Sequence, residues 1–222
     1  MNKATLEKIR DEYKSASGVV SKRIIVCAGT GCIANGSLAV YDALKEAVET
    51  LGASLFVELE LDRHDCKDKV HLSNSGCQGF CAQGPLVNIL PDETMYVKVK
   101  PEDALEIVQK TVLANEVIDR LLYVNPANGE KSRGQLDIPF YKLQNRLVLG
   151  ECGHVDPENI REYISHNGYF AAEKAYNTMT DEQVCDNILE SGLRGRGGGG
   201  FPTGRKWHLT RVVEADKKYV IC

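Results

Sequence analysis

The chain has 222 residues, of which 43% are hydrophobic and 26% are charged, as is ordinary for a globular protein with one or two modest cores. Its formal net charge of −4 argues against a broad phosphate-binding surface, so nucleic acid is not an expected partner. The longest apolar runs are strand-sized, far short of the ~20 residues that a bilayer requires. We therefore expect a protein without membrane insertion.

Helix and strand patterns alternate over the first 116 residues, which form the first predicted domain. Ser37 is the predicted N-cap of the second helix, Gly52 ends that helix, and Pro101 opens the last one. The predicted elements are a helix over 4–16, a strand over 23–28, a helix between 37 and 52, strands over 53–61 and 70–73, a hairpin of 86–90 and 95–99, and a helix over 101–114. This order indicates a compact α/β layer that resembles thioredoxin.

Eight cysteines occur in a chain whose first ten residues are charged and lack an apolar core, so we expect no signal peptide. A cytoplasmic location follows, with a reducing interior in which thiols serve as ligands. Four cysteines form two close pairs, Cys27-x4-Cys32 and Cys77-x3-Cys81, in glycine-rich loops expected at one end of the sheet. Four thiolates that converge from two loops make a metal site. The others stand alone and are predicted to be structural: Cys66, Cys152, Cys185 and Cys222.

Three kinds of site compete for this quartet. Zinc ribbons usually use C-x2-4-C pairs on tight turns, so one x4 pair and one x3 pair is allowed but atypical. Two disulfides would suit a small secreted scaffold. A [2Fe–2S] cluster would use the glycine-rich loops, whose N–H groups can point at bound sulfur.

The order of the pairs, x4 before x3 with a helix and a strand between them, resembles the thioredoxin-like [2Fe–2S] ferredoxins. These include the small flavoprotein-partner subunit of respiratory complex I. The resemblance implies that the four cysteines hold a [2Fe–2S] cluster: Cys27, Cys32, Cys77 and Cys81. The 44 residues between the pairs exceed the family's usual gap. We place the surplus in the polar loop over 62–69, away from the cluster.

The regular helix and strand patterns end after residue 116. Residues 117–153 are interpreted as a linker that docks on partners, with an ordinary loop as the alternative. Two helices are predicted next. Asp156 caps the first, which ends before Gly168, and the capping box Thr180-Asp-Glu-Gln183 opens the second, which ends at Gly192.

A glycine loop follows, Leu193-Arg-Gly-Arg-Gly-Gly-Gly-Gly-Phe-Pro-Thr-Gly-Arg-Lys-Trp207. It follows a helix instead of a strand, which disfavours a Rossmann fingerprint, and the residue after Lys206 is not Ser or Thr, which excludes a Walker A loop. Successive glycines allow backbone to contact a flat or anionic ligand, and a helix that begins near Thr203 directs free N–H groups at phosphate. Arg196 adds charge, and Phe201 can stack on a ring. A flexible tether is the alternative.

This stretch resembles the signature of the flavin- and NADH-binding subunit of complex I and of related hydrogenases and formate dehydrogenases. Ile138-Pro-Phe-Tyr-Lys142 and Cys152-Gly153 resemble that family's lead-in. The resemblance implies that residues 154–222 are the mainly helical N-terminal portion of an FMN/NADH-binding domain. It implies FMN contacts from Gly195, Arg196, Gly197 and Lys206, and a dinucleotide side lined by Gly198, Gly199, Gly200, Phe201, Thr203 and Gly204.

The combination resembles the beta subunit of NAD(P)-linked, electron-bifurcating [FeFe]-hydrogenases. It implies hydride exchange between NAD(H) or NADP(H) and FMN, and single-electron relay through iron–sulfur clusters. No side chain need act as acid or base, so no catalytic residue is predicted. Implied partners are a catalytic iron–sulfur subunit and a small ferredoxin-like subunit, and a ferredoxin could exchange electrons with them.

Other assignments remain open: a diaphorase subunit of a formate dehydrogenase or a complex I-like enzyme, a flavin-free [2Fe–2S] carrier, or a zinc-stabilised scaffold. Family members continue beyond the position of Cys222 with an acidic flavin segment and cysteines for a [4Fe–4S] cluster. We therefore expect the FMN/NADH-binding domain to be truncated here and its flavin site to be half built.

Overall fold

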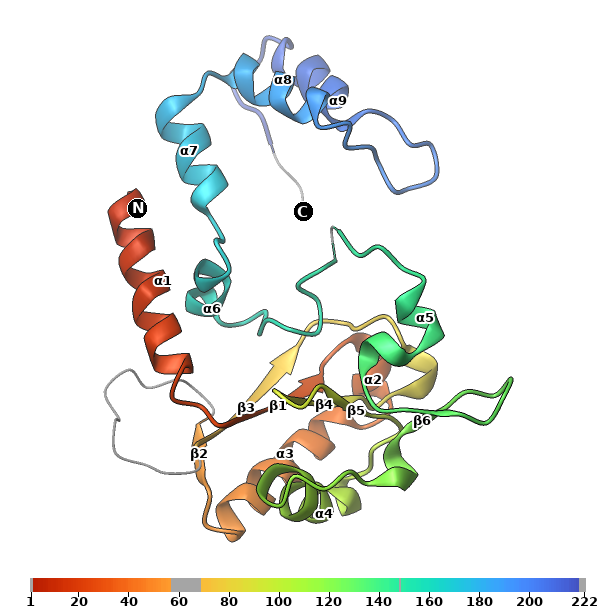
Figure 1. Ribbon diagram of the computed structural model, residues 1–222. Coiled ribbons are helices and arrows are strands. Elements are labelled where there is room, and N and C mark those ends of the chain that lie inside the picture. Colours follow the sequence, from red (N-terminus) through yellow and green to blue (C-terminus); the bar gives the residue numbers. More distant parts are fainter. Residues whose placement is uncertain (1, 57–68, 148, 220–222) are drawn as a thin grey trace. The chain divides into compact units, whose positions relative to one another are not determined.

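The computed structural model describes residues 2–56, 69–147 and 149–219 (Figure 1). They divide into two compact units, which we name the cysteine unit (7–167) and the loop unit (1–6 and 168–222). The helices are α1 (Lys3–Ser17), α2 (Thr30–Ala34), α3 (Ser37–Thr50), α4 (Ala104–Glu106), α5 (Pro139–Lys142), α6 (Ile160–Ser165), α7 (Phe170–Thr178), α8 (Asp181–Glu190) and α9 (Thr203–Arg211). The strands are β1 (Lys22–Cys27), β2 (Ser54–Phe56), β3 (Lys69–Ser75), β4 (Val87–Leu90), β5 (Thr94–Tyr96), β6 (Tyr123–Val124) and β7 (Lys131–Ser132).

The cysteine unit is built on a mixed sheet in the order β2-β3-β1-β4-β5. Strands β2, β3 and β1 are parallel, whereas β4 is antiparallel to β1 and pairs with β5 in the predicted hairpin. Parallel strands end at the same edge of a sheet, and Cys27 at the end of β1 pairs with Ser75 at the end of β3. Both cysteine loops therefore leave the sheet at one edge, as predicted. The α/β, thioredoxin-like fold expected from the sequence is confirmed.

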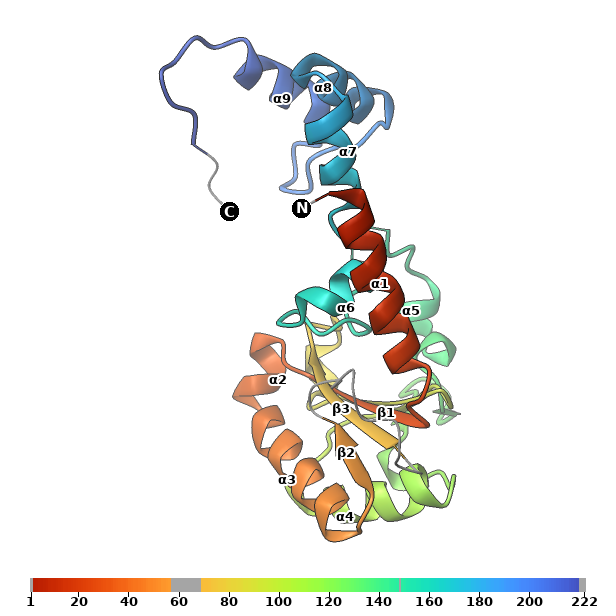
Figure 2. The same cartoon turned by 90° about the vertical axis from the view of Figure 1, so that its left-hand side faces the viewer.

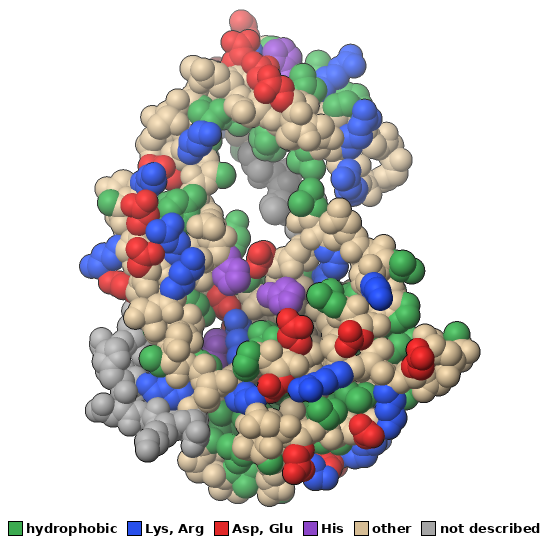
Figure 3. Space-filling view, in the orientation of Figure 1, with side chains coloured by type: hydrophobic (Ala, Val, Ile, Leu, Met, Phe, Trp, Pro, Cys, Tyr) green, Lys and Arg blue, Asp and Glu red, His purple; other side chains and the backbone are tan. Residues whose placement is uncertain are grey.

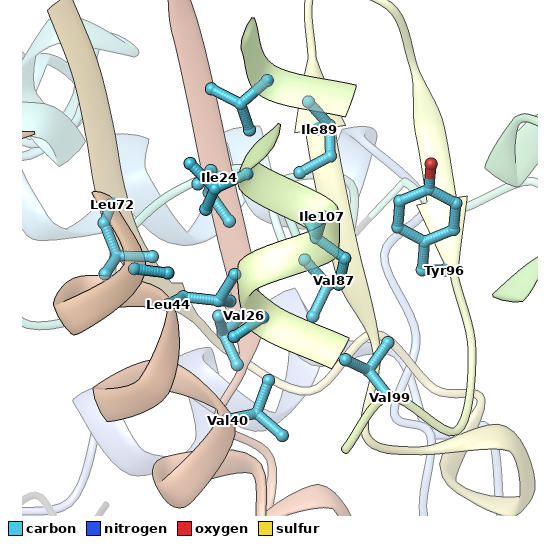
Figure 4. Close-up of a cluster of buried hydrophobic side chains, with 14 of the residues drawn as sticks. Ile24, Val26, Val40, Leu44, Leu72, Val87, Ile89, Tyr96, Val99 and Ile107 are labelled. Carbon is cyan, nitrogen blue, oxygen red and sulfur yellow. The ribbon is translucent and has the colours of Figure 1, made fainter. Parts of the chain in front are cut away.

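A hydrophobic core lies between the sheet and one helical layer. Helix α3 and the helical segment over 101–113, in which α4 continues into the π-helical Ile107–Leu113, supply one side of it. Figure 4 shows the side chains that meet there: Ile24, Val26, Val40, Leu44, Leu72, Val87, Ile89, Tyr96, Val99 and Ile107. Figure 2 shows α3 and α4 on the same side of the sheet.

The opposite face of the sheet carries polar side chains, and α6 covers part of it through an ion pair. Glu162 of α6 is 1% exposed and accepts a hydrogen bond from the Arg23 guanidinium of β1 over 2.5 Å. Arg23 also donates to the Ser73 hydroxyl of β3, and the second Glu162 oxygen accepts from the Asp156 N–H at 3.0 Å. The pair therefore joins residues 156–162 to two strands of the sheet.

The loop unit contains α7, α8 and α9. Thr180 and Gln183 form the predicted capping box, since the Thr180 hydroxyl accepts from the Gln183 N–H and the Gln183 side chain accepts from the Thr180 N–H. Helices α8 and α9 run antiparallel: Arg211 near the end of α9 pairs with Asp181 at the start of α8, while Gly204 at the start of α9 lies against Leu189 near the end of α8.

Several local expectations are corrected. Gly36, in the left-handed conformation at φ 90°, is the N-cap of α3, because the chain leaves α2 directly before it, and the buried Ser37 is the first helical residue. Asn159 caps α6 in place of Asp156, through its carboxamide oxygen and the N–H groups of residues 161 and 162. Helices α2 and α7 were not expected. Of the strand predicted over 53–61, β2 covers 54–56, and residues 57–61 lie outside the described part.

No helix among the described residues is long and apolar enough to cross a membrane. Figure 3 shows acidic and basic side chains interspersed over the visible face, without a broad basic patch among the residues drawn in colour.

The Arg23–Glu162 pair is expected to contribute strongly to stability. Glu162→Gln leaves the guanidinium without its counter-ion in a mostly buried setting, so the free energy of unfolding should fall by about 3 kcal/mol in urea titrations. The matched control is Glu158→Gln at an exposed position, with an expected change below about 0.5 kcal/mol. Equal losses in the two variants would contradict the role given to the pair.

His71 in β3 makes stability depend on pH. The imidazole is 3% exposed, and burial, aided by the Arg23 charge, lowers its pKa from 6.5 to about 3. Between these values the unfolded chain binds a proton that the native state excludes. The free energy of unfolding should therefore fall by up to about 1.4 kcal/mol per pH unit as the pH drops from about 6 to about 3, and this group should have no effect above about pH 7. Denaturant titrations of wild type and His71→Gln measure this, and a difference between them that does not change with pH would count against it.

Candidate metal centre and glycine loop

The four paired cysteines come together at the edge where β1 and β3 end. The sulfur atoms of Cys77 and Cys81 lie 3.8 Å apart, and the Cys27 and Cys32 thiols are near enough to shift the pKa values of each other. The first loop touches the second cysteine pair directly, because a Cβ built on Gly31 would lie 3.2 Å from the Cys81 sulfur. The structure thus brings all four predicted ligands into one site of the cysteine unit.

Three glycines make this approach feasible because they have no side chain. A Cβ on Gly29 would lie 2.7 Å from the Cβ of Cys77, and one on Gly84 would lie 2.6 Å from the Cys32 sulfur. Gly31 is only slightly less crowded. Gly29 has an ordinary φ of −66°, so this position requires glycine for space and not for an unusual backbone conformation.

Backbone N–H groups surround the sulfur atoms. The hydrogen bond from Cys32 lowers the pKa of Cys27 to about 6, against the effect of burial, and the N–H groups of Gln78 and Gly29 lower it further. The same hydrogen bond and burial raise the pKa of Cys32. In the second pair, the Gly79 N–H lies 3.4 Å from the Cys77 sulfur. Donors arranged in this way stabilise thiolates and the sulfur atoms of a cluster.

The donor set fits an iron–sulfur cluster. Every described cysteine is a free thiol, so no disulfide competes for the four ligands within that part of the chain. Two cysteine pairs from neighbouring loops offer two ligands for each of the two irons of such a cluster. Cys27 and Cys32 are 1% exposed, whereas Cys77 and Cys81 reach solvent.

The segment predicted to be a linker packs beside this site. Ile138 and Tyr141 are buried in one apolar cluster with Cys27 and Cys32. Phe80, which lies between the second pair in sequence, stacks on Phe140 with ring centroids 4.9 Å apart. Sequence reasoning noted Ile138-Pro-Phe-Tyr-Lys142 only as a family resemblance. Its run of apolar residues next to a proline was the available signal for burial.

The glycine loop joins α8 to α9 as a narrow hairpin. The Gly195 N–H donates to the Phe201 carbonyl at 2.9 Å, and the Thr203 N–H donates to the Leu193 carbonyl at 2.9 Å. Between these bonds the chain reverses at Gly198 and Gly200, whose φ values of 112° and 57° favour glycine.

The predicted contact residues of this loop fall into two groups. Residues 194–199 are exposed along the arch, and Phe201 is 46% exposed with the Arg205 guanidinium 5.9 Å from its ring centroid. Gly204 is buried instead, because a Cβ there would lie 2.3 Å from the Leu189 nitrogen. Arg196 and the exposed glycines therefore lie along the arch, Thr203 and Lys206 lie in the first turns of α9, and Gly204 serves in helix packing.

The remaining cysteines do not join the site where they are described. Cys152 is half-buried and Cys185 is buried in α8. Cys66 and Cys222 lie outside the described residues.

Comparison with known proteins identifies the cysteine unit. Residues 13–112 match the family model described as thioredoxin-like [2Fe-2S] ferredoxin. The 2Fe-2S ferredoxin of Clostridium pasteurianum is 38% identical over 98 residues, which cover 44% of this chain and 91% of that protein.

Longer relatives also match. The HndC subunit of the NADP-reducing hydrogenase of Solidesulfovibrio fructosivorans is 48% identical over 81 residues, 36% of this chain and 16% of that protein. The alpha subunit of the NAD-reducing hydrogenase HoxS of Cupriavidus necator is 28% identical over 200 residues, 90% of this chain and 29% of that protein. An NADH-quinone oxidoreductase subunit of Buchnera aphidicola is 50% identical over 64 residues, 28% of this chain and 14% of that protein. The chain spans less than a third of each of these three.

The ferredoxin is similar over nearly its whole length, and the longer relatives are subunits of NAD(P)-linked oxidoreductases. The chain therefore belongs to the thioredoxin-like [2Fe-2S] ferredoxin family, as an iron–sulfur electron-transfer protein related to hydrogenase and NADH-quinone oxidoreductase subunits.

Proposed function

We propose that Cys27, Cys32, Cys77 and Cys81 hold a [2Fe–2S] cluster that relays single electrons within an NAD(P)-linked hydrogenase complex. The observation that carries this proposal is the convergence of four free thiols from two loops, with N–H groups directed at their sulfur atoms. Such a cluster accepts or donates one electron at a time.

The two cysteine pairs would have different roles. Cys27 and Cys32 are enclosed by apolar side chains, which exclude water from their side of the site. Cys77 and Cys81 are exposed, so a redox partner can approach closely on their side. We infer that electrons enter and leave past the second pair.

The glycine loop would bind the nucleotide part of the system. Its exposed arch offers backbone N–H groups, the charges of Arg196 and Lys206 suit phosphate, and Phe201 offers a ring face at the N-terminus of α9. FMN, when bound, couples the two-electron chemistry of NAD(H) or NADP(H) to one-electron carriers. The names of the relatives, NADP-reducing and NAD-reducing hydrogenase, support this pairing.

The setting we propose is a multi-subunit hydrogenase of the electron-bifurcating [FeFe] type. A catalytic iron–sulfur subunit and a small ferredoxin-like subunit would be the partners. A [4Fe–4S] cluster would belong to the flavin-binding part of the same enzyme.

A flavin-free electron carrier is the second candidate, and one observation favours it. The cysteine site is assembled within a single unit of the chain, whereas the residues assigned to FMN lie on an exposed arch with no enclosing wall described around them.

Ligation by the four cysteines predicts a coloured protein that depends on each of them. We expect anaerobically purified or reconstituted protein to contain about two irons and two sulfides per chain, and Cys32→Ala or Cys77→Ala to lose the cluster. The control is Cys152→Ala, since Cys152 is a free thiol outside the site. Iron and sulfide analysis with visible absorption is the measurement. Colourless wild type, or full iron content in Cys32→Ala or Cys77→Ala, would overturn this assignment.

Nucleotide binding by the loop predicts a charge-dependent affinity for FMN. Arg196→Ala and Lys206→Ala should each weaken FMN binding about tenfold, because each removes a charge-assisted contact. Titration of FMN followed by flavin fluorescence measures this, with Lys217→Ala, an exposed lysine outside the loop, as the control. Wild type that contains iron but shows no FMN affinity would support the flavin-free carrier instead.

A further inference from the structure

Tyr141 has a buried hydroxyl group without a partner. The residue lies in α5 and is 3% exposed, and its hydroxyl oxygen has no hydrogen-bond partner among the described residues. A buried hydroxyl that lacks a partner destabilises the folded state, so such a group usually has a partner beyond the protein atoms. The Gln135 amide nitrogen, which is also buried, lies beside this hydroxyl and lowers the pKa of Tyr141, as a donor to the phenol oxygen does. Such a donor still leaves the hydroxyl proton without an acceptor.

Tyr141 lies beside the cysteine site. Tyr141 belongs to the same buried cluster as Cys27 and Cys32. Its ring meets Phe80 edge-on with centroids 5.5 Å apart, and Phe80 lies between Cys77 and Cys81 in the second loop. Tyr141 therefore contacts the walls of the site that both cysteine loops form.

The tyrosine keeps its proton in this position. Burial raises the pKa of Tyr141 to about 12, although the Gln135 side chain and the Arg146 charge act in the opposite direction. A phenol hydroxyl carries one proton that it can donate, so this group needs an acceptor. The acceptors that this site offers to the hydroxyl are sulfur atoms, because they carry negative charge in a bound cluster.

We propose that the Tyr141 hydroxyl donates a hydrogen bond to a sulfur atom of the bound [2Fe–2S] cluster and thereby raises its reduction potential. Reduction adds one electron and increases the negative charge on the sulfur atoms, so a donor stabilises the reduced state more than the oxidised state. This proposal rests on the four-cysteine ligation proposed above. Residue 141 lies beyond residues 13–112, so the donor comes from outside the part matched by the ferredoxin family model.

The first test removes only the hydroxyl. Tyr141→Phe should lower the equilibrium constant for one-electron reduction about tenfold, which corresponds to a midpoint potential about 59 mV lower. The measurement is a redox titration of the whole chain with dithionite, followed by electron paramagnetic resonance and visible absorption. Tyr123→Phe is the matched control, because Tyr123 also contacts Phe80, with centroids 5.4 Å apart, but is only partly buried. Its midpoint should equal that of wild type.

A second variant tests the same hydrogen bond while it keeps the hydroxyl group of residue 141. Tyr141→3-fluorotyrosine keeps the ring and makes the hydroxyl a stronger donor, so the midpoint should rise above that of wild type. If Tyr141→Phe does not retain its cluster, the midpoint potential of the 3-fluorotyrosine variant alone tests the hydrogen bond. A cluster whose potential is unchanged in both variants overturns this inference alone, whereas wild type without any cluster overturns the ligation as well.

Discussion

The site depends on the parallel pairing of β1 with β3. Their register runs from Lys22 opposite Val70 to Cys27 opposite Ser75, so each strand delivers its loop to the same edge at the same height. A shift of one residue would turn Cys27 toward the opposite face of the sheet. The buried residues of β1 and β3 that pack on α3 fix this register, since they cannot face solvent without loss of the core. The arrangement of the cysteine loops is therefore set by hydrophobic packing some distance from the sulfur atoms.

Much of the fold could be predicted because its signals are local. Strand β1, the β4–β5 hairpin and the Thr180 capping box all follow from short patterns, and all three are present. The identity of the four converging cysteines also followed from spacing. The helix starts at Gly36 and Asn159 could not be predicted, because the choice among neighbouring cap residues depends on where the preceding chain is held. That constraint is tertiary and leaves little trace in the sequence.

The packing of residues 133–142 beside the cysteines was missed for a related reason. A short stretch with one proline and few periodic residues has no helix or strand signature, and its burial depends on a cavity that other segments create. Ile138 and Tyr141 fill that space beside Cys27 and Cys32. The glycines of the site are a parallel case. The sequence shows how many glycines there are, but only the structure shows why each is needed. Gly29 and Gly84 lie too close to cysteine atoms for a side chain, whereas Gly36 adopts a left-handed backbone conformation.

The helical hairpin that carries the glycine loop has a consequence for how a ligand would be bound. Backbone hydrogen bonds at 193–203 and 195–201 tie the two ends of the arch together, and the close fit of Gly204 on Leu189 holds its base to α8. The chain therefore loses the conformational entropy of closing the arch when the protein folds, before any ligand binds. A ligand bound there would have to immobilise only the few residues at the crest, so the flexibility of the glycines would lower its affinity little.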